Sequence, residues 1–124
     1  MYAYNNQKNP PEPIVPIKIF PPSGVQKNPI TLFVLADTGA DYTCLPLNIF
    51  SSLNHLPNGT IRVNGVVGSA QVNLYSVDIE FHNRLFPCCS IVELAQGAQA
   101  ILGRDIMNAY RLEFNGPSNY LDVI

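Results

Sequence analysis

An apolar run that stops at a carboxylate constrains this chain more than any other feature. Residues 30–36 are apolar except for Thr31, and Asp37, Thr38 and Gly39 follow directly. A short apolar run bounded by a turn signal is typical of a buried strand. A carboxylate at its end is costly to desolvate unless another group compensates, and scaffold edges often carry catalytic groups. We therefore interpret Asp37 as a candidate catalytic acid or base.

The rest of the chain predicts an all-β protein. Eleven prolines, together with Gly and Asn clusters, separate short apolar runs. Residues 1–13 are rich in Asn, Gln and Pro, which predicts a flexible N-terminal arm. Residues 14–124 are long enough for one folded domain with a modest core. Within this domain, Pro16 restricts the strand predicted over residues 14–20 to a sheet edge or an irregular strand.

A long hairpin is the second prominent feature. Residues 61–74 alternate apolar and polar side chains around Asn64, Gly65 and Gly68, which predicts two paired arms with a mobile tip. The second arm is expected to continue to Phe81, before a turn at the next two residues. The remaining predicted elements are strands over 41–46, 85–94, 99–102, 111–114 and 120–124, a helical turn within 47–56 and a helix over 104–110.

Composition excludes several classes of function. The net charge is −2 and no basic run occurs, so nucleic-acid binding has no electrostatic support. No apolar stretch approaches the roughly 20 residues that span a bilayer, so we expect no membrane partner. Residues 1–8 are polar and lack the apolar core of a secretory signal. We therefore expect a cytoplasmic protein, and we expect no cofactor.

The cysteines and histidines do not suggest a metal site or a thiol nucleophile. Cys44, Cys88 and Cys89 make an odd count, and they lie in apolar runs, which favours reduced, buried thiols. No Cys-x-x-Cys or paired-histidine spacing occurs, so we expect no metal. His55 and His82 are isolated, and each is expected to be a solvated loop residue.

Three motifs occur in the order and at the spacing of a known family. The first is Leu35-Ala36-Asp37-Thr38-Gly39-Ala40-Asp41, the second is the hairpin Val63 to Ala70, and the third is Ala100-Ile101-Leu102-Gly103-Arg104-Asp105. Over about residues 13–124 the chain resembles the retropepsins, the homodimeric aspartic proteases of retroviruses and their cellular and bacterial relatives. It departs from many relatives in its small Ala36 and in having fewer glycines at the hairpin tip.

The resemblance implies a retropepsin-like acid-protease barrel with one short C-terminal helix, active as a two-fold homodimer. The implied function is that of an aspartic endopeptidase, in which water is activated between Asp37 and Asp37 of a second chain. Such hydrolysis needs two carboxylates, one to take a proton from water and one to stabilise the developing oxyanion. The sequence has one Asp-Thr-Gly and no Asp-Ser-Gly, so the second carboxylate must come from another copy.

The resemblance also assigns roles to the neighbours of Asp37. The Thr38 hydroxyl would bond across the two-fold axis, and Gly39 would let substrate and backbone approach closely. Ala40 would line the substrate channel. Asp41 and Arg104 would form an ion pair, within one chain or across to its mate.

Substrate contacts follow from the same resemblance. The hairpin tip would act as a flap that closes over an extended peptide; its residues are Val63, Asn64, Gly65, Val66, Val67, Gly68 and Ser69. Arg62 and Ile101 are pocket candidates. The strand over 120–124 would pair with its mate, and the N-terminal strand is a further candidate partner. A shared interface would fit the 47% hydrophobic and 13% charged composition.

Simpler interpretations stay open for each motif. An Asp-Thr-Gly sequence is typical of a turn in which Asp37 caps its own backbone. Asp41 and Arg104 can be a surface pair of little energy, and Gly65 with Gly68 an ordinary hairpin turn. Because fold does not fix function, the alternative function is a catalytically weak dimerisation or peptide-binding module with the retropepsin fold. The intact Asp-Thr-Gly motif argues against this alternative.

Overall fold

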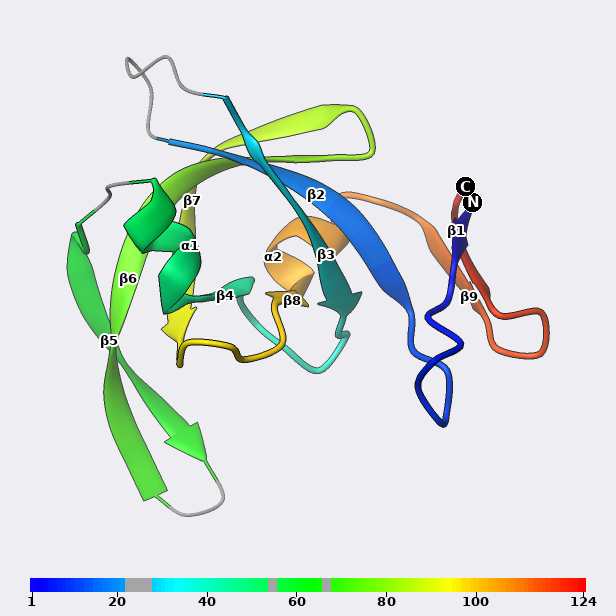
Figure 1. The fold of residues 1–124 in the computed structure, drawn as a ribbon, viewed down its shortest axis with the longest axis horizontal. Coiled ribbons are helices and arrows are strands. Elements are labelled where there is room, and N and C mark those ends of the chain that lie inside the picture. The colour runs from blue at the N-terminus through cyan, green and yellow to red at the C-terminus, as the bar shows by residue number, and fades with distance from the viewer. Residues whose placement is uncertain (22–27, 54–55, 66–67) are drawn as a thin grey trace.

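The computed structural model describes residues 1–21, 28–53, 56–65 and 68–124, and the chain is mostly β within these ranges (Figure 1). This confirms the predicted all-β class. No helix in the described ranges has the length and apolar character needed to cross a membrane. The elements are β1 (Tyr2–Ala3), β2 (Ile14–Phe20), β3 (Ile30–Ala36), β4 (Cys44–Pro46), α1 (Leu47–Ser52), β5 (Gly59–Gly65), β6 (Gly68–Phe81), β7 (Arg84–Leu94), β8 (Ile101–Leu102), α2 (Arg104–Met107), β9 (Leu112–Asn115) and β10 (Tyr120–Val123).

Two sheets organise these strands. The larger sheet has seven strands in the order β2-β3-β8-β4-β7-β6-β5, and β2 also pairs with β6. The smaller sheet has the order β1-β10-β9, with antiparallel neighbours. β2 pairs with β3 along most of its length but with β6 only from Lys18 onward. Pro16 therefore has one side free of a strand partner in the described structure, as expected for a strand proline.

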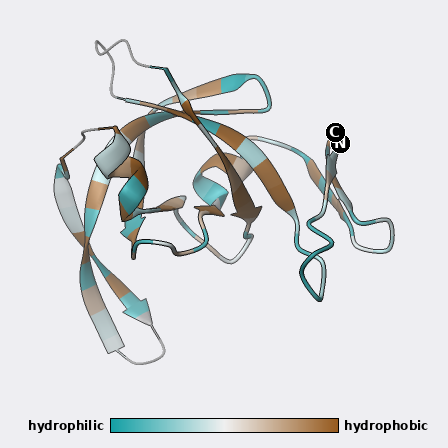
Figure 2. Ribbon diagram, viewed as in Figure 1, coloured by the Kyte–Doolittle hydropathy of each residue, from teal (hydrophilic) through white to brown (hydrophobic). Residues whose placement is uncertain are grey.

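β3 forms the strand that the apolar run predicted, but only one of its faces is buried. Val34 and Ala36 are buried, whereas Phe33 on the opposite face is 58% exposed. Figure 2 shows the apolar colouring concentrated toward the C-terminal end of β3. Side chains alternate between the two faces of a strand, so an apolar run does not by itself establish that both faces are covered.

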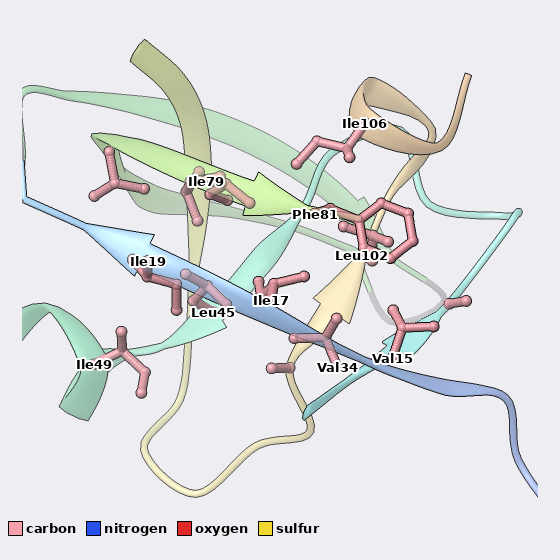
Figure 3. Close-up of a cluster of buried hydrophobic side chains, with 14 of the residues drawn as sticks. Val15, Ile17, Ile19, Val34, Leu45, Ile49, Ile79, Phe81, Leu102 and Ile106 are labelled. Atoms are coloured by element: carbon pink, nitrogen blue, oxygen red, sulfur yellow. The ribbon is translucent and has the colours of Figure 1, made fainter. Parts of the chain in front are cut away.

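The core is a cluster of buried apolar side chains, most of which come from strands of the larger sheet (Figure 3). Burial of apolar area is the main stabilising term in such a core. At one end, the rings of Phe50 and Tyr75 stack with their centroids 3.6 Å apart. The fully buried side chains labelled in Figure 3 come from five strands and from α2: Val15, Ile17, Ile19, Val34, Leu45, Ile79, Phe81, Leu102 and Ile106.

The turn that joins β6 to β7 forms where the sequence predicts it. His82 and Asn83 have φ values of 50° and 62°, which is the left-handed conformation that favours tight hairpins. The pairing of β6 with β7 also has a register shift, between Val77 and Ile79. Cys88 lies opposite this shift and has φ 54°. The Cys88 N–H donates to Asp78 Oδ1 at 2.9 Å. The irregularity is thus held by a side-chain acceptor.

The N-terminal segment, which the sequence predicts to be a flexible arm, makes specific contacts. Tyr2 pairs with Leu121 and Ala3 with Tyr120, so β1 adds a strand to β10. Tyr2 Oη also hydrogen-bonds His82 Nδ1 at 2.7 Å. The two termini consequently lie side by side (Figure 1). Composition did not indicate these contacts, because they depend on a strand more than 100 residues away in sequence.

Two backbone segments cross in close contact at Gly103. β8 lies between β3 and β4, so the residue that follows β8 meets the segment that leads into β4. A Cβ on Gly103 would lie 2.4 Å from Tyr42 C, 2.6 Å from Tyr42 O and 2.8 Å from Thr43 N. These neighbours are backbone atoms, which cannot move aside as a flexible side chain can. The crossing therefore requires glycine for space.

Gly103→Ala should lower the free energy of unfolding by about 2–3 kcal/mol, because the crossing backbones must separate. Gly116→Ala is the matched control, since a Cβ there meets nothing within 4 Å. The control should change stability by less than about 1 kcal/mol. Urea unfolding of both variants measures the difference, and equal losses would contradict the close crossing.

Candidate active site

Asp37 stands directly after β3, half-buried at the start of a tight turn. Its N–H donates to Leu102 O on β8 at 3.1 Å, and its carbonyl accepts from the Ala40 N–H at 3.1 Å. The Gly39 N–H donates to Asp37 Oδ1 at 2.9 Å. Within the described residues, Oδ2 has no donor. Asp37 therefore caps its own turn, as the simpler interpretation predicts. The turn uses only one carboxylate oxygen, so the other can accept a hydrogen bond from a ligand.

Arg104, the first residue of α2, holds the loop of residues 37–41 in place. Its Nη1 donates to Thr38 O at 3.0 Å, and its N–H donates to Ala40 O at 2.9 Å. Its Nη2 pairs with Asp41 Oδ1 within the same chain. The two side chains are 44% and 73% exposed, so the ion pair contributes little energy. The hydrogen bonds to backbone carbonyls fix the loop instead.

A second connection, between Thr43 and Asp105, was not predicted from the sequence. Thr43 is fully buried; its hydroxyl donates to Asp105 Oδ1 at 2.8 Å and accepts from the Gly103 N–H at 3.1 Å. The Thr43 N–H donates to Asp105 Oδ2 at 3.0 Å. In the sequence, Asp105 stands out only as the last residue of the third motif. The available signal was a hydroxyl residue inside the strand predicted over residues 41–46, because a hydroxyl that is buried in a strand needs a partner.

Two adjoining surface cavities border the β5–β6 hairpin. The first, which we call the loop cavity, has a volume of about 510 Å³ and the second, the hairpin cavity, about 390 Å³. Cys44, Val63 and Val92 line both. The loop cavity is otherwise lined by Gly39, Ala40, Asp41, Tyr42, Ile61, Arg62 and Asn64, and the hairpin cavity by Gly68, Ser69, Ala70, Val72, Glu93 and Leu94.

Only some of the other predicted site residues line these cavities. Arg62 lines the loop cavity, and its Nη1 donates to Ser69 Oγ at 3.0 Å. Ile101 is half-buried on β8 and lines neither cavity. Thr38 is exposed, and its hydroxyl has no protein partner among the described residues. A Cβ on Gly39 would lie 3.2 Å from Asp37 Oδ1, so the turn favours glycine there.

The predicted flap corresponds to the end of the β5–β6 hairpin. Val63 pairs with Ala70, Asn64 with Ser69 and Gly65 with Gly68. Val66 and Val67 lie outside the described residues. Figure 1 shows the two strands of this hairpin extending beyond the other strands of the sheet. Gly68 has φ +123°, a conformation that side chains rarely adopt.

Burial raises the pKa of two of the three thiols. All three cysteines are free. Burial, with smaller effects of Asp105 and Asp37, raises the pKa of the Cys44 thiol to about 11. Burial and then Asp105 raise the pKa of Cys89 to about 11. Among the described residues, no group of three or more His, Cys, Asp or Glu side chains could hold a metal ion.

Alkylation at pH 8 should modify the exposed Cys88 first. Cys44 and Cys89 should react about a hundredfold more slowly than a thiol of ordinary pKa, because the thiolate is the reactive form. Their rates should rise as the pH approaches 11. Iodoacetamide labelling followed by peptide mass spectrometry measures each site, and Cys88→Ser should remove the fast site. Labelling of Cys44 as fast as Cys88 would contradict its burial.

Comparison with known proteins finds likeness among solved structures. No protein-family model matches the chain, and no curated protein matches it in sequence. Among solved structures, the chain is similar to an EIAV protease in complex with the inhibitor HBY-793, with a TM-score of 0.59 and 26% sequence identity. The likeness covers 86% of this chain and 92% of that protease. It supports a retropepsin-like fold for this chain.

Proposed function

We propose that the chain is an aspartic endopeptidase that acts as a two-fold homodimer. Water would be activated between Asp37 and Asp37 of a second chain. The observation that carries the proposal is the half-buried Asp37 carboxylate. One of its oxygens has no donor among the described residues, and its loop is fixed by Arg104. The similarity to the EIAV protease supports the same reaction class.

The chemistry requires a second carboxylate close to the first. One member of the pair, ionised, takes a proton from water, while the other, protonated, donates to the scissile carbonyl. Two such groups in contact share one proton, because ionising both is costly. They titrate as a pair rather than individually. Because the chain has a single Asp-Thr-Gly, a two-fold axis beside Asp37 supplies the second group.

The neighbouring residues have roles in this arrangement. The exposed Thr38 hydroxyl would donate across the axis to the partner's backbone. Ala40 and Arg62, which line the loop cavity, would contact an extended peptide. The hairpin end, residues 63–69, would close over that peptide and exclude water. Arg104 would act as a positioning residue through its bonds to the carbonyls of Thr38 and Ala40.

The small sheet offers a surface for the second chain. Its β10 already has partners on both sides, β1 and β9, within one chain. Pairing with the mate would therefore use an outer edge of this sheet rather than β10 alone. Met1, Phe114 and Ile124 are exposed on or beside its strands, and an interface would remove this apolar area from water. This arrangement would extend the sheet across the two-fold axis.

Asp37→Asn should reduce peptide cleavage by at least about a hundredfold, because the amide cannot take or give the proton. The dimer should remain, since Gly39 can still donate to the Asn oxygen. Asp78→Asn is the matched control, because that carboxylate also accepts a backbone N–H but from Cys88; it should retain activity. A peptide library read by mass spectrometry and sedimentation measure the two properties.

Wild-type turnover in Asp37→Asn would overturn the assignment. A wild-type chain that binds peptides without cleaving them would favour the alternative, a dimerisation or peptide-binding module. The same library distinguishes these results, because it reports bound and cleaved peptides separately.

A further inference from the structure

The hairpin cavity combines apolar walls with a single carboxylate. Val63, Ala70, Val72, Val92 and Leu94 supply apolar lining, and Glu93 supplies the charge. Glu93 is half-buried near the end of β7. Carboxylates in such surroundings usually have a charged partner or several donors. The partners of Glu93 therefore indicate whether it is a structural residue or is available to a ligand.

Two side chains of β6 hold the Glu93 carboxylate in place. Tyr75 Oη donates to Oε1 at 2.7 Å, and Asn73 Nδ2 lies 3.4 Å from Oε1 and 3.3 Å from Oε2. Burial, followed by the hydrogen bond to Glu93, raises the pKa of Tyr75 to about 12. The hydroxyl therefore stays protonated and remains a donor at neutral pH. These contacts orient the carboxylate but do not neutralise its charge.

Glu93 has no cationic partner in the part of the chain that the structure describes. The ion pairs there join the Met1 ammonium to Asp122, Lys18 to Glu80 and Arg104 to Asp41. Arg62, the cation of the neighbouring loop cavity, donates to the Ser69 hydroxyl instead. A charge that is oriented by neutral donors, beside an apolar cavity, is suited to pair with a cation that arrives with the ligand.

We propose that Glu93 is a specificity-determining residue, which selects a Lys or Arg side chain of an extended peptide bound in the hairpin cavity. The proposal rests on the proposed function, since the hairpin cavity adjoins the loop cavity through Cys44, Val63 and Val92. The loop cavity in turn contains Gly39, Ala40 and Asp41 of the candidate catalytic loop.

The chemistry of a basic side chain fits both parts of this site. The aliphatic stem of Lys or Arg packs on apolar walls, while its charged end can reach a carboxylate. A hydrogen bond between two charged groups is stronger than one between neutral groups. A neutral side chain of similar length would fill the cavity without pairing with Glu93, and an acidic one would meet a like charge. Lys and Arg are therefore preferred over norleucine, and norleucine over Glu.

Peptides that differ at one position test this preference. A library in which each position is in turn Lys, norleucine or Glu should show, at one position, about a tenfold higher kcat/KM for Lys than for norleucine. Glu93→Gln should reduce this ratio to about one, because the amide can accept from Tyr75 but carries no charge. Glu93→Lys should reverse the preference toward Glu.

Two controls separate the charge of Glu93 from other effects. Glu80→Gln removes a carboxylate that pairs with Lys18 outside both cavities, so it should keep the Lys preference. In the wild-type protein, the preference should weaken as salt rises, because salt screens the attraction between the peptide cation and the half-buried carboxylate, although less than between exposed charges. This second measurement needs no variant and holds even if a Glu93 variant fails to fold.

The outcomes distinguish failure of this inference from failure of the proposed function. Cleavage with no preference for Lys, or with a preference that Glu93→Gln leaves intact, would overturn the role of Glu93. The proposed peptidase function would still stand. If no peptide is cleaved, the proposed function is wrong, and binding of the same peptides by fluorescence anisotropy then tests Glu93. Equal affinity for the Lys and norleucine peptides would overturn the inference; tighter binding of the Lys peptide would support it.

Discussion

The close crossing of backbone at Gly103 is the constraint on which the site depends. It brings the segment before β4 against the start of α2, within reach of both Arg104 and Asp105. Arg104 then bonds the carbonyls of the Asp37 loop, and Asp105 bonds Thr43. A side chain at Gly103 would push these partners apart. The carboxylate at the end of β3 therefore has a fixed place because a glycine lies more than 60 residues later in the sequence.

This arrangement separates the tasks of the polar residues around Asp37. Gly39 satisfies one carboxylate oxygen, and the other is left for a partner that the described residues do not provide. The Arg104–Asp41 pair is exposed and adds little stability. Its contribution is to orient the guanidinium, which donates to Thr38 O. In the hairpin cavity, Tyr75 and Asn73 orient Glu93 in a comparable way. At both places, protein donors position a carboxylate without neutralising it.

Features that depend on neighbouring residues could be predicted from the sequence, and pairings between distant residues could not. The strand before Asp37 and the turn at His82 follow from local alternation and turn chemistry. The burial of Thr43 against Asp105 depends on β8 lying between β3 and β4. The pairing of Tyr2 with Leu121 likewise joins opposite ends of the chain. Local patterns show that a polar group needs a partner, but the topology decides which partner it meets.

The central claim is that one catalytic centre needs Asp37 from two chains. Mixing equal amounts of wild-type and Asp37→Asn protein, after subunit exchange at fixed total concentration, tests this most directly. If each centre requires two intact carboxylates, activity should fall to about a quarter of the wild-type value, because random pairing leaves that fraction of intact dimers. Activity of about a half, as independent chains would give, would contradict the account.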